Sequence, residues 1–218
     1  MNSDYRLLWL RFRLESDATF GRGDGIPGLI DRDVALDAYG CPYLHGRTLK
    51  GLLGEVCADI LFALEYNEVW KKAANHLFGI PGSRHEQGIL RIGHAQLPAA
   101  LRSTIQLAQD WTPQEVTASL TAVRRQTALE IGGAPDPRTL RSMRVILRET
   151  RFEAQLTIME QMSAQEQAFL SACVKGLRRA GTARNRGRGR LTAWLDDHAS
   201  HNVSDSWFAN FKQEAGAA

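Results

Sequence analysis

The apolar residues of this chain follow two different periods, and the order of those periods limits the folds that the chain can adopt. A period of two is typical of a half-buried strand, and a period of three to four is typical of an amphipathic helix. The predicted elements are strands over residues 5–14, 89–94, 151–159 and 191–195, and helices over residues 46–64 and 163–177. The sequence order of strand, helix, strand, strand, helix, strand predicts an α+β fold close to the split βαβ motif.

Three of these segments carry the clearest signals. In residues 5–14, Leu8, Leu10, Phe12 and Leu14 share one face. Phe152, Ala154, Leu156 and Ile158 do the same in residues 151–159. The second helix begins after Ser163, and Glu166 stands three positions later, which is the spacing of a capping box.

The length and cysteine content narrow the class of protein. A chain of 218 residues with 44% hydrophobic residues can bury a core as one domain, or as one domain with a large insertion. Charges interrupt the apolar run near the N-terminus, so we expect neither a signal peptide nor a membrane association. Cys41, Cys57 and Cys173 lack metal-ligand spacing, which favours a reduced cytoplasmic setting without structural zinc.

The positive charge is concentrated in one part of the sequence. Residues 138–190 contain 12 lysines and arginines against 4 acidic residues, although the whole chain has a net charge of only +3. The flanking regions are weakly acidic, with 14 basic against 16 acidic residues before position 138 and 1 against 4 after position 190. Such an asymmetry is expected of a nucleic-acid site, and a solvated basic face is the competing interpretation.

The segment RRAGTARNRGRGR, residues 178–190, combines six arginines with three glycines. Glycine permits positive φ and a close approach of the main chain to a ligand. Arginine supplies forked donors that match the geometry of a phosphate. The segment is therefore predicted to be a helix-to-strand loop that binds a polyanion, with an ordinary solvated turn as the alternative.

Two further segments are candidates for function: the long loop before the first predicted helix, and the first turn of that helix. Residues 18–42 form a long loop rich in glycine and aspartate, and long loops on compact domains are often functional. Arg47 and Lys50 lie in the first turn of the helix, where positive charge opposes the helix dipole. A nearby phosphate would offset this repulsion and would also be favoured by the N-terminal amides.

Taken together, four ordered motifs resemble the RAMP superfamily of CRISPR proteins, and within it the backbone subunit of type III effector complexes. The motifs are GLIDRDVALDAYGCPYLHGRTLKGLL, HLFG, GILRIGHAQL and AGTARNRGRGRL. The resemblance spans about residues 5–195. It implies a ferredoxin-like, RRM-related core with an antiparallel sheet, two helices and an inserted thumb.

The resemblance also implies a domain organisation and a set of partners. Residues 1–195 would form one domain, with the thumb inserted at about residues 98–143. We predict this segment to be irregular because it contains Pro113, Gly132, Gly133, Pro135 and Pro137. The partners implied are CRISPR RNA, target RNA and other subunits of the complex, including copies or paralogues of this chain. Residues 196–218 form a tail beyond the family pattern, and its amphipathic stretch over residues 203–211 would either dock on a neighbouring subunit or cap its own core.

Asp31 falls where the resembled subunits carry an aspartate required to cut target RNA. The implied reaction is attack of a 2′-hydroxyl on the scissile phosphate, which usually depends on Mg²⁺ or another divalent cation. No dedicated metal site is identifiable, and a turn-capping role for Asp31 is the alternative. Asp33 and Asp37 are predicted to be structural, as is His94, although uncertainty in the loop register keeps Asp33 open as a site residue.

The residues predicted to bind RNA come from the basic loop, the helix entry and the thumb. They are Arg22, His45, Arg47, Thr48, Lys50, Arg124, Arg125, Arg138, Arg141, Gly181, Arg184, Arg186, Gly187, Arg188 and Gly189, and Arg144 is expected to face RNA with them. Two other functions stay open. One is a guide-binding scaffold or capping subunit that cuts nothing, and the other is an endonuclease that processes precursor CRISPR RNA with His45 as acid or base.

Overall fold

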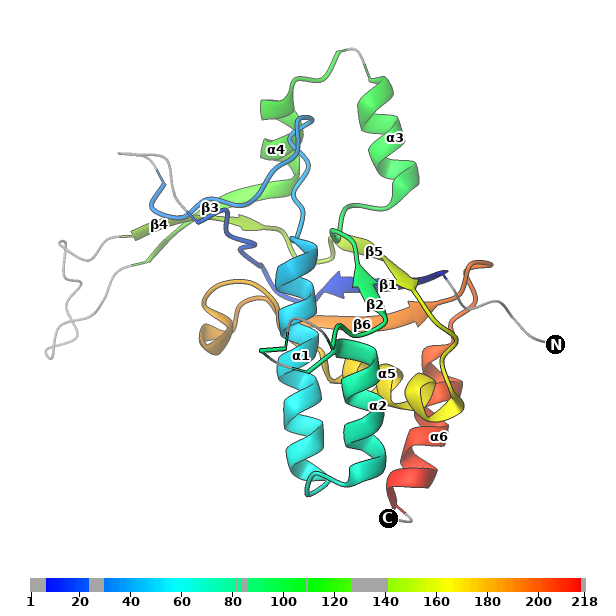
Figure 1. Ribbon diagram of the computed structural model, residues 1–218. Coiled ribbons are helices and arrows are strands. Elements are labelled where there is room, and N and C mark those ends of the chain that lie inside the picture. Colours follow the sequence, from blue (N-terminus) through cyan, green and yellow to red (C-terminus); the bar gives the residue numbers. More distant parts are fainter. Residues whose placement is uncertain are drawn as a thin grey trace, which may run out of the picture.

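The computed structural model describes residues 7–23, 30–80, 82–83, 86–108, 110–126 and 141–216. Six strands and six α-helices occur in these ranges. In chain order they are β1 (Leu7–Leu14), α1 (Gly46–Ala63), α2 (Glu68–Phe78), β2 (Leu90–Ile92), α3 (Ala99–Leu107), α4 (Pro113–Leu120), β3 (Thr121–Gln126), β4 (Arg141–Ile146), β5 (Arg151–Ile158), α5 (Ala164–Gly176), β6 (Leu191–Asp196) and α6 (Ser204–Gly216). In Figure 1, α2, α5, α6 and most of α1 lie below the central sheet, whereas α3 and α4 stand above it.

The central sheet has four strands in the order β2-β5-β1-β6, and each neighbouring pair is antiparallel. Strand β5 lies between β1 and β2 and therefore splits a parallel pair that helix α1 connects. Strand β6 adds to the other side of β1. This strand order, with α1 and α5 as the two crossing helices, is a ferredoxin-like core, so the predicted α+β fold is confirmed.

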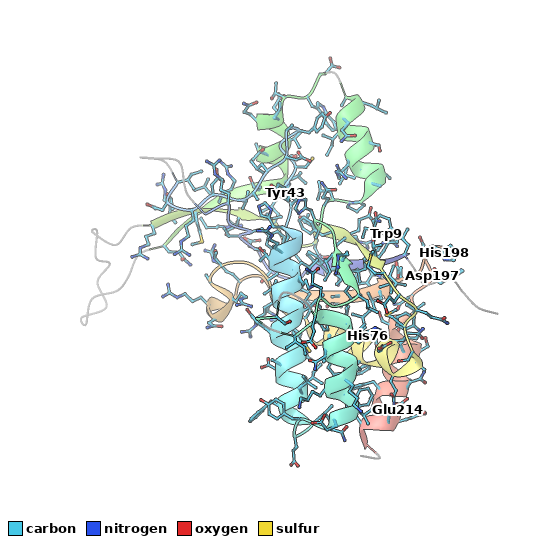
Figure 2. All side chains as sticks on the ribbon, in the orientation of Figure 1. Trp9, Tyr43, His76, Asp197, His198 and Glu214 are labelled. Carbon is cyan, nitrogen blue, oxygen red and sulfur yellow. The ribbon has the colours of Figure 1, made fainter. Side chains whose placement is uncertain are left out.

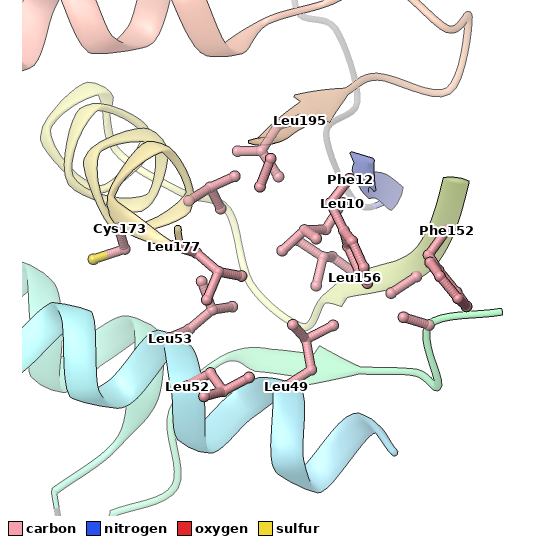
Figure 3. Close-up of a cluster of buried hydrophobic side chains, with 14 of the residues drawn as sticks. Leu10, Phe12, Leu49, Leu52, Leu53, Phe152, Leu156, Cys173, Leu177 and Leu195 are labelled. Carbon is pink, nitrogen blue, oxygen red and sulfur yellow. The ribbon is translucent and has the colours of Figure 1, made fainter. Parts of the chain in front are cut away.

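The core lies between one face of this sheet and the helices. Leu8, Leu10, Phe12 and Leu14 are fully buried, as the period-two pattern of β1 predicts. Facing them from the helices are Leu49, Leu53, Cys173 and Leu177 (Figure 3). Phe12 also stacks on Phe152, with ring centroids 5.2 Å apart. Burial of these side chains supplies the main free energy that holds α1 and α5 on the sheet.

Helix α5 begins with the predicted capping box. The Ser163 hydroxyl accepts a hydrogen bond from the Glu166 amide, and the Glu166 carboxylate accepts one from the Ser163 amide. Glu166 also bonds His76 on α2, with Oε1 and Nδ1 2.5 Å apart. The same carboxylate therefore caps α5 and ties it to α2.

The C-terminal helix α6 packs on the chain's own core. Trp207 is 6% exposed, and the ring of Phe211 lies 5.0 Å from that of Trp70 and 6.3 Å from that of Phe169. Of the two predicted roles for this tail, capping its own core is the one that these contacts show.

The segment between β2 and β5 contains regular structure. Helices α3 and α4 are followed by the antiparallel β3–β4 hairpin, which extends to the left in Figure 1. The prediction that residues 98–143 are irregular is therefore wrong for the described part of the segment. Helix α4 packs closely against the loop between β1 and α1, because the Thr117 hydroxyl donates to the Gly40 carbonyl and a Cβ at Gly40 would meet Pro113 O at 2.1 Å.

The described helices include none that combines the length and the apolar character of a membrane span. The three cysteines are free and buried.

Candidate nucleic-acid interface

The predicted catalytic aspartate and the glycine-arginine loop line the same groove. This groove, here called the Asp31 groove, has a volume of about 550 Å³. Its lining residues come from the loop after β1, from the end of β3 and the start of β4, and from the loop after α5. They are Asp31, Arg32, Gln126, Arg141, Ser142, Met143, Gly181, Thr182, Ala183, Arg184, Asn185 and Arg186. Segments that are more than 100 positions apart in the sequence therefore form one surface.

Asp31 is exposed and is held in place by β4. Its amide donates to the Ser142 carbonyl at 3.0 Å. Its Oδ2 accepts from the Ser142 amide at 2.6 Å and from the Ser142 hydroxyl at 3.3 Å. Oδ1 accepts no hydrogen bond from any described residue. One carboxylate oxygen of Asp31 is thus fixed by β4, and the other has no partner in the described part of the chain.

The two neighbouring aspartates have structural roles. Asp33 is 4% exposed, and its Oδ1 accepts from Arg144 Nε at 2.9 Å and from the Val34 amide at 2.8 Å. Asp37 accepts hydrogen bonds from the amides of Tyr39 and Cys41, as the side chain of a turn-forming aspartate does. The structural interpretation of both residues agrees with these bonds.

Arg144 is held by the same ion pair. Its side chain is 19% exposed, and besides Asp33 it contacts the Thr121 hydroxyl at 3.3 Å. The ion pair gives Arg144 a structural role, and its contact with RNA stays a prediction. A sequence pattern of basic residues does not show which of them pair with a buried acid.

The glycine-arginine loop is fixed to the chain near the end of β1. Thr182 donates to the Thr19 carbonyl, and the amides of Ala180 and Gly189 donate to Gly189 O and Asp17 O. Three of its residues with positive φ are the predicted glycines, Gly181, Gly187 and Gly189, and Ala183 has the same sign. These hydrogen bonds hold the loop against the segment that follows β1.

The glycines are required mostly for packing within the protein. A Cβ at Gly181 would lie 2.5 Å from Thr19 O, and one at Gly189 would lie 1.9 Å from Ala180 O. Around Gly187 no described atom lies within 4 Å of such a Cβ. Gly187 alone therefore fits the prediction of a glycine that leaves room for a ligand, whereas Gly181 and Gly189 allow the loop to lie against its own main chain.

A second groove continues on the other side of this loop. This groove, here called the α1 groove, has a volume of about 420 Å³ and shares Gly181, Thr182 and Arg184 with the Asp31 groove. Thr48, Gly51, Leu52 and Glu55 line it from one face of α1, and the other lining residues are Phe20, Gly21, Gly23, Tyr43, Leu44 and His45. The two grooves are thus adjacent, with Arg184 at their junction.

Arg184 is paired with an acidic residue at that junction. Its Nη1 lies 2.8 Å from Glu55 Oε2, and its Nη2 lies 3.5 Å from Oε1. The hydrogen bond that the Arg184 guanidinium donates to this carboxylate raises the pKa of Arg184. Arg184 is therefore part of the candidate interface, but its charge is partly neutralised by α1.

The entry to α1 contains a cluster of three rings. Tyr43, His45 and His94 have ring centroids 4.8 to 5.4 Å apart. Tyr43 lies just above the N-terminal end of α1 (Figure 2). His94 Nδ1 accepts from the Gly46 amide at 3.0 Å, so His94 satisfies one free donor of the helix N-terminus. His94 is structural, as predicted, while His45 is exposed and lines the α1 groove.

The other predicted residues of the helix entry lie outside the lining of the two grooves. Arg47 is exposed and Lys50 is half-buried. Burial lowers the pKa of Lys50, and the positive charge of Arg91 lowers it further. Arg22 is exposed between Gly21 and Gly23, which both line the α1 groove.

The arginines of the β3–β4 hairpin lie on opposite faces. Since Arg124 pairs with Met143 and Arg125 with Ser142, the two arginines point to different sides of the ribbon. Arg141 is on the same side as Arg124 and lines the Asp31 groove. Arg124 is bound to Asp17 at 3.0 Å.

Of the predicted loop residues, Gly181, Arg184 and Arg186 line the two grooves, whereas Gly187, Arg188 and Gly189 lie outside them. Arg186 is exposed and lines the Asp31 groove. Arg188 lines neither groove, and its Nη1 contacts Met143 Sδ at 2.8 Å. Arg138 lies outside the described residues.

Several lining residues were missed by the sequence analysis. Thr182, Asn185, Gln126 and Ser142 are polar residues without a charge, so neither a charge count nor a glycine pattern indicates them. Glu55 was missed because an acid on a helix surface resembles any solvated residue. A helical projection of Thr48, Gly51 and Glu55 would have placed them on one face.

The residues present do not form a metal site made by protein alone. The described residues include no cluster of three or more His, Cys, Asp or Glu side chains with metal-binding geometry. Asp31 offers one carboxylate oxygen. This arrangement fits only a cation such as Mg²⁺ that keeps several waters and is also held by substrate phosphates.

Comparison with solved structures gives the same fold. A chain of a type III-B Cmr-beta complex bound to cognate target RNA matches with a TM-score of 0.62 and 12% identity, over 87% of this chain and 96% of that one. A chain of the apo Cmr-beta complex matches with a TM-score of 0.63 and 12% identity, over 92% and 99%. These matches establish the fold. No family model and no curated protein sequence matches the chain.

Proposed function

We propose that the chain is a guide-binding subunit of a type III CRISPR effector complex, and that Asp31 takes part in cutting the target RNA. One observation carries this proposal: the Asp31 groove combines an available carboxylate oxygen with a glycine-arginine loop and with Arg141. The shared fold with a chain of a complex bound to target RNA supports it, as do the ordered sequence motifs.

In this proposal the guide lies along the two adjacent grooves and contacts the protein through its backbone. Arg186, Arg141 and the loop amides provide positive charge and donors for phosphates. Thr48 and His45 provide polar contacts in the α1 groove. Sequence specificity then comes from pairing between guide and target, as in other RNA-guided systems.

For cleavage, the nucleophile is the 2′-hydroxyl next to the scissile phosphate. Asp31 Oδ1 accepts the hydrogen bond of this hydroxyl and orients it, while Oδ2 stays fixed by Ser142. Arg141 and Arg186 stabilise the charge that develops on the phosphate. The 2′-oxygen forms a bond to phosphorus as the bond from phosphorus to the 5′-oxygen breaks; Asp31 takes the proton of the 2′-hydroxyl and water protonates the leaving 5′-oxygen, which gives a 2′,3′-cyclic phosphate and a 5′-hydroxyl. A divalent cation held by Asp31 and the phosphate would add further charge neutralisation.

A subunit that binds the guide without cutting is the second candidate function. The hydrogen bonds of Asp31 to Ser142 favour it, because they give the aspartate a structural role in joining the loop to the hairpin. A third candidate, processing of precursor RNA by His45, has less support, because the nearest rings to His45 are Tyr43 and His94, and His94 is engaged with the α1 N-terminus.

RNA binding is tested by comparing two arginines of the same charge. Fluorescence anisotropy with labelled single-stranded RNA is measured over a series of salt concentrations for Arg186→Ala. The matched control is Arg151→Ala, because Arg151 is an exposed arginine on β5 that lines neither groove. We expect Arg186→Ala to weaken binding and to reduce the salt slope by about 0.7, the value for one phosphate contact on a single strand. Equal slopes for wild type and Arg186→Ala would contradict the proposed path of the RNA.

A further inference from the structure

A third groove lies at the outer edge of the sheet and shares no lining residue with the two grooves above. This groove, here called the β6-edge groove, has a volume of about 810 Å³. Its walls are the end of α5, the start of β6, one residue of α1 and the aromatic side of α6. It is not used by the proposed function.

The lining of this groove is cationic and partly aromatic. Lys175, Arg178, Arg179 and Arg190 line it, and among the described lining residues Glu15 is the one acid. Lys175 pairs with Asp205 at 2.6 Å and Arg190 with Glu15 at 3.6 Å, whereas Arg178 has no acidic partner in the described part of the chain. Phe208, Phe211 and Ile60 form its apolar wall. The groove therefore suits a ligand with both negative charge and apolar groups.

The base of the groove is an incomplete strand edge. The Leu191 amide donates to Arg178 O at 2.9 Å, and the Leu195 carbonyl accepts from the Val203 amide at 3.0 Å. These bonds show that residues 191 and 195 direct their backbone groups away from β1. Ala193 has the same parity, so its N–H and C=O point the same way. Neither group has a hydrogen-bond partner among the described residues.

This edge distinguishes between two polyanionic ligands. A phosphate group accepts hydrogen bonds but donates none, so RNA bound here through its phosphates leaves the Ala193 carbonyl unpaired unless a 2′-hydroxyl or a base N–H reaches it. An extended peptide supplies both an N–H and a C=O and can pair with both groups of Ala193, as in strand addition to a sheet edge. Ala193 is also nearly buried, which makes an unpaired backbone group there costly.

We propose that the β6-edge groove binds an extended acidic segment of a neighbouring protein subunit, which adds one short strand beside β6. The peptide backbone pairs with Ala193. Its carboxylates lie near Arg178 and Arg190, and its apolar side chains contact Phe208 and Ile60. Edge strands with free backbone groups are common sites of such pairing.

The test uses a fluorescein-labelled peptide of alternating glutamate and valine with blocked ends, added to the full chain. Binding is followed by fluorescence anisotropy. Arg178→Glu should weaken it about tenfold, since one charge contact is lost and one repulsion is introduced. Lys72→Glu changes the net charge equally on the exposed surface of α2 and should leave the affinity within twofold. A peptide with lysine in place of glutamate should not bind.

Two N-methylated peptides test the backbone pairing without changing the protein. In one peptide every valine amide is methylated, and in the other every glutamate amide. Because alternate amides of a strand point to the same side, one of the two peptides should bind about tenfold more weakly and the other should bind as well as the parent. Equal effects of both methylations would overturn the proposed strand.

RNA is the competing occupant of this groove, and competition in the peptide-binding assay distinguishes it from a peptide. Oligouridine should not displace the peptide at concentrations that saturate the chain's RNA binding. Displacement by oligouridine, combined with loss of its binding in Arg178→Glu, would show that the groove takes RNA and would overturn the proposal. No change in peptide binding on Arg178→Glu would overturn it as well.

Discussion

Replacing Asp33 by asparagine tests whether two nearby aspartates have the different roles that their contacts indicate. Asp33 and Arg144 form an ion pair of 2.9 Å in which the side chains are 5% and 19% exposed. Asp33→Asn leaves the guanidinium half-buried without its counter-charge. Loss of one partner of a fully buried ion pair lowers the free energy of unfolding by about 3 to 5 kcal/mol. Because Arg144 is partly exposed, we expect Asp33→Asn to lower it by about 2 to 3 kcal/mol.

Asp31→Asn is the matched control. Asp31 is exposed, and an asparagine oxygen can still accept from the Ser142 amide. We therefore expect a cost below about 1 kcal/mol. Urea denaturation followed by circular dichroism gives both free energies of unfolding, and a melting scan should show a Tm lower by roughly 5 to 10 °C for Asp33→Asn.

The reasoning is refuted if Asp33→Asn costs no more than Asp31→Asn. A double-mutant cycle with Arg144→Met isolates the pair, because Arg144→Met should remove most of the penalty of Asp33→Asn. If the effects of the two substitutions on the free energy of unfolding are additive, the ion pair does not stabilise the loop. Asp33 would then again be a candidate residue of the RNA-cleaving site.

Three further predictions concern pH, backbone and charge. Burial alone would lower the pKa of His76, but hydrogen bonds to two glutamates raise it above 6.5. The stabilisation by His76 is therefore complete below pH 6.5 and is lost as the pH rises through the raised pKa. The difference in free energy of unfolding in urea between wild type and His76→Gln should shrink from pH 5.5 to pH 9, and a constant difference would contradict this prediction. Gly189→Ala should lower the free energy of unfolding by more than about 3 kcal/mol, because the new Cβ would overlap a carbonyl oxygen 1.9 Å away. Gly187→Ala, also at positive φ but in open space, should lower it by about 1 kcal/mol in the same thermal assay. Glu55→Gln frees Arg184, and it should tighten binding of single-stranded RNA and steepen the salt slope by about 0.7; an unchanged slope would show that Arg184 contacts no phosphate.

The core of the fold was predictable because its signals are local. Alternation in β1 and β5 and the capping box at Ser163 each depend on a few neighbouring residues. Helix α2 was missed although its signal is present: Trp70, Ala73, Ala74 and Leu77 have helical spacing and are buried. A systematic search for that spacing would have found it.

The inserted segment was misread because proline was taken as a sign of irregular structure. Pro98 is the N-cap of α3, and Pro113 occupies the first turn of α4, where a missing N–H costs nothing. Helix α3 begins directly after Pro98, and α4 begins at Pro113. The position of a proline relative to a capping residue such as Thr112 is therefore more informative than its presence.

The candidate site was predictable residue by residue but not as an arrangement. The sequence indicated Asp31 and Arg186 separately, and only the fold shows that they line one groove. Charge counting also could not separate Arg144, which is bound to Asp33, from Arg141, which lines the groove. Ion pairs between residues more than 100 positions apart depend on tertiary structure, which no local pattern contains.

The central claim is tested most directly by cleavage of guide-complementary RNA with the reconstituted effector complex. Wild type and Asp31→Ala are compared on a denaturing gel, each with Mg²⁺ and with EDTA, and target binding is measured in parallel. The account predicts regularly spaced fragments from the wild type with Mg²⁺ and bound but intact RNA from Asp31→Ala. Fragments of the same size and yield from Asp31→Ala would contradict it and would leave the chain as a guide-binding scaffold.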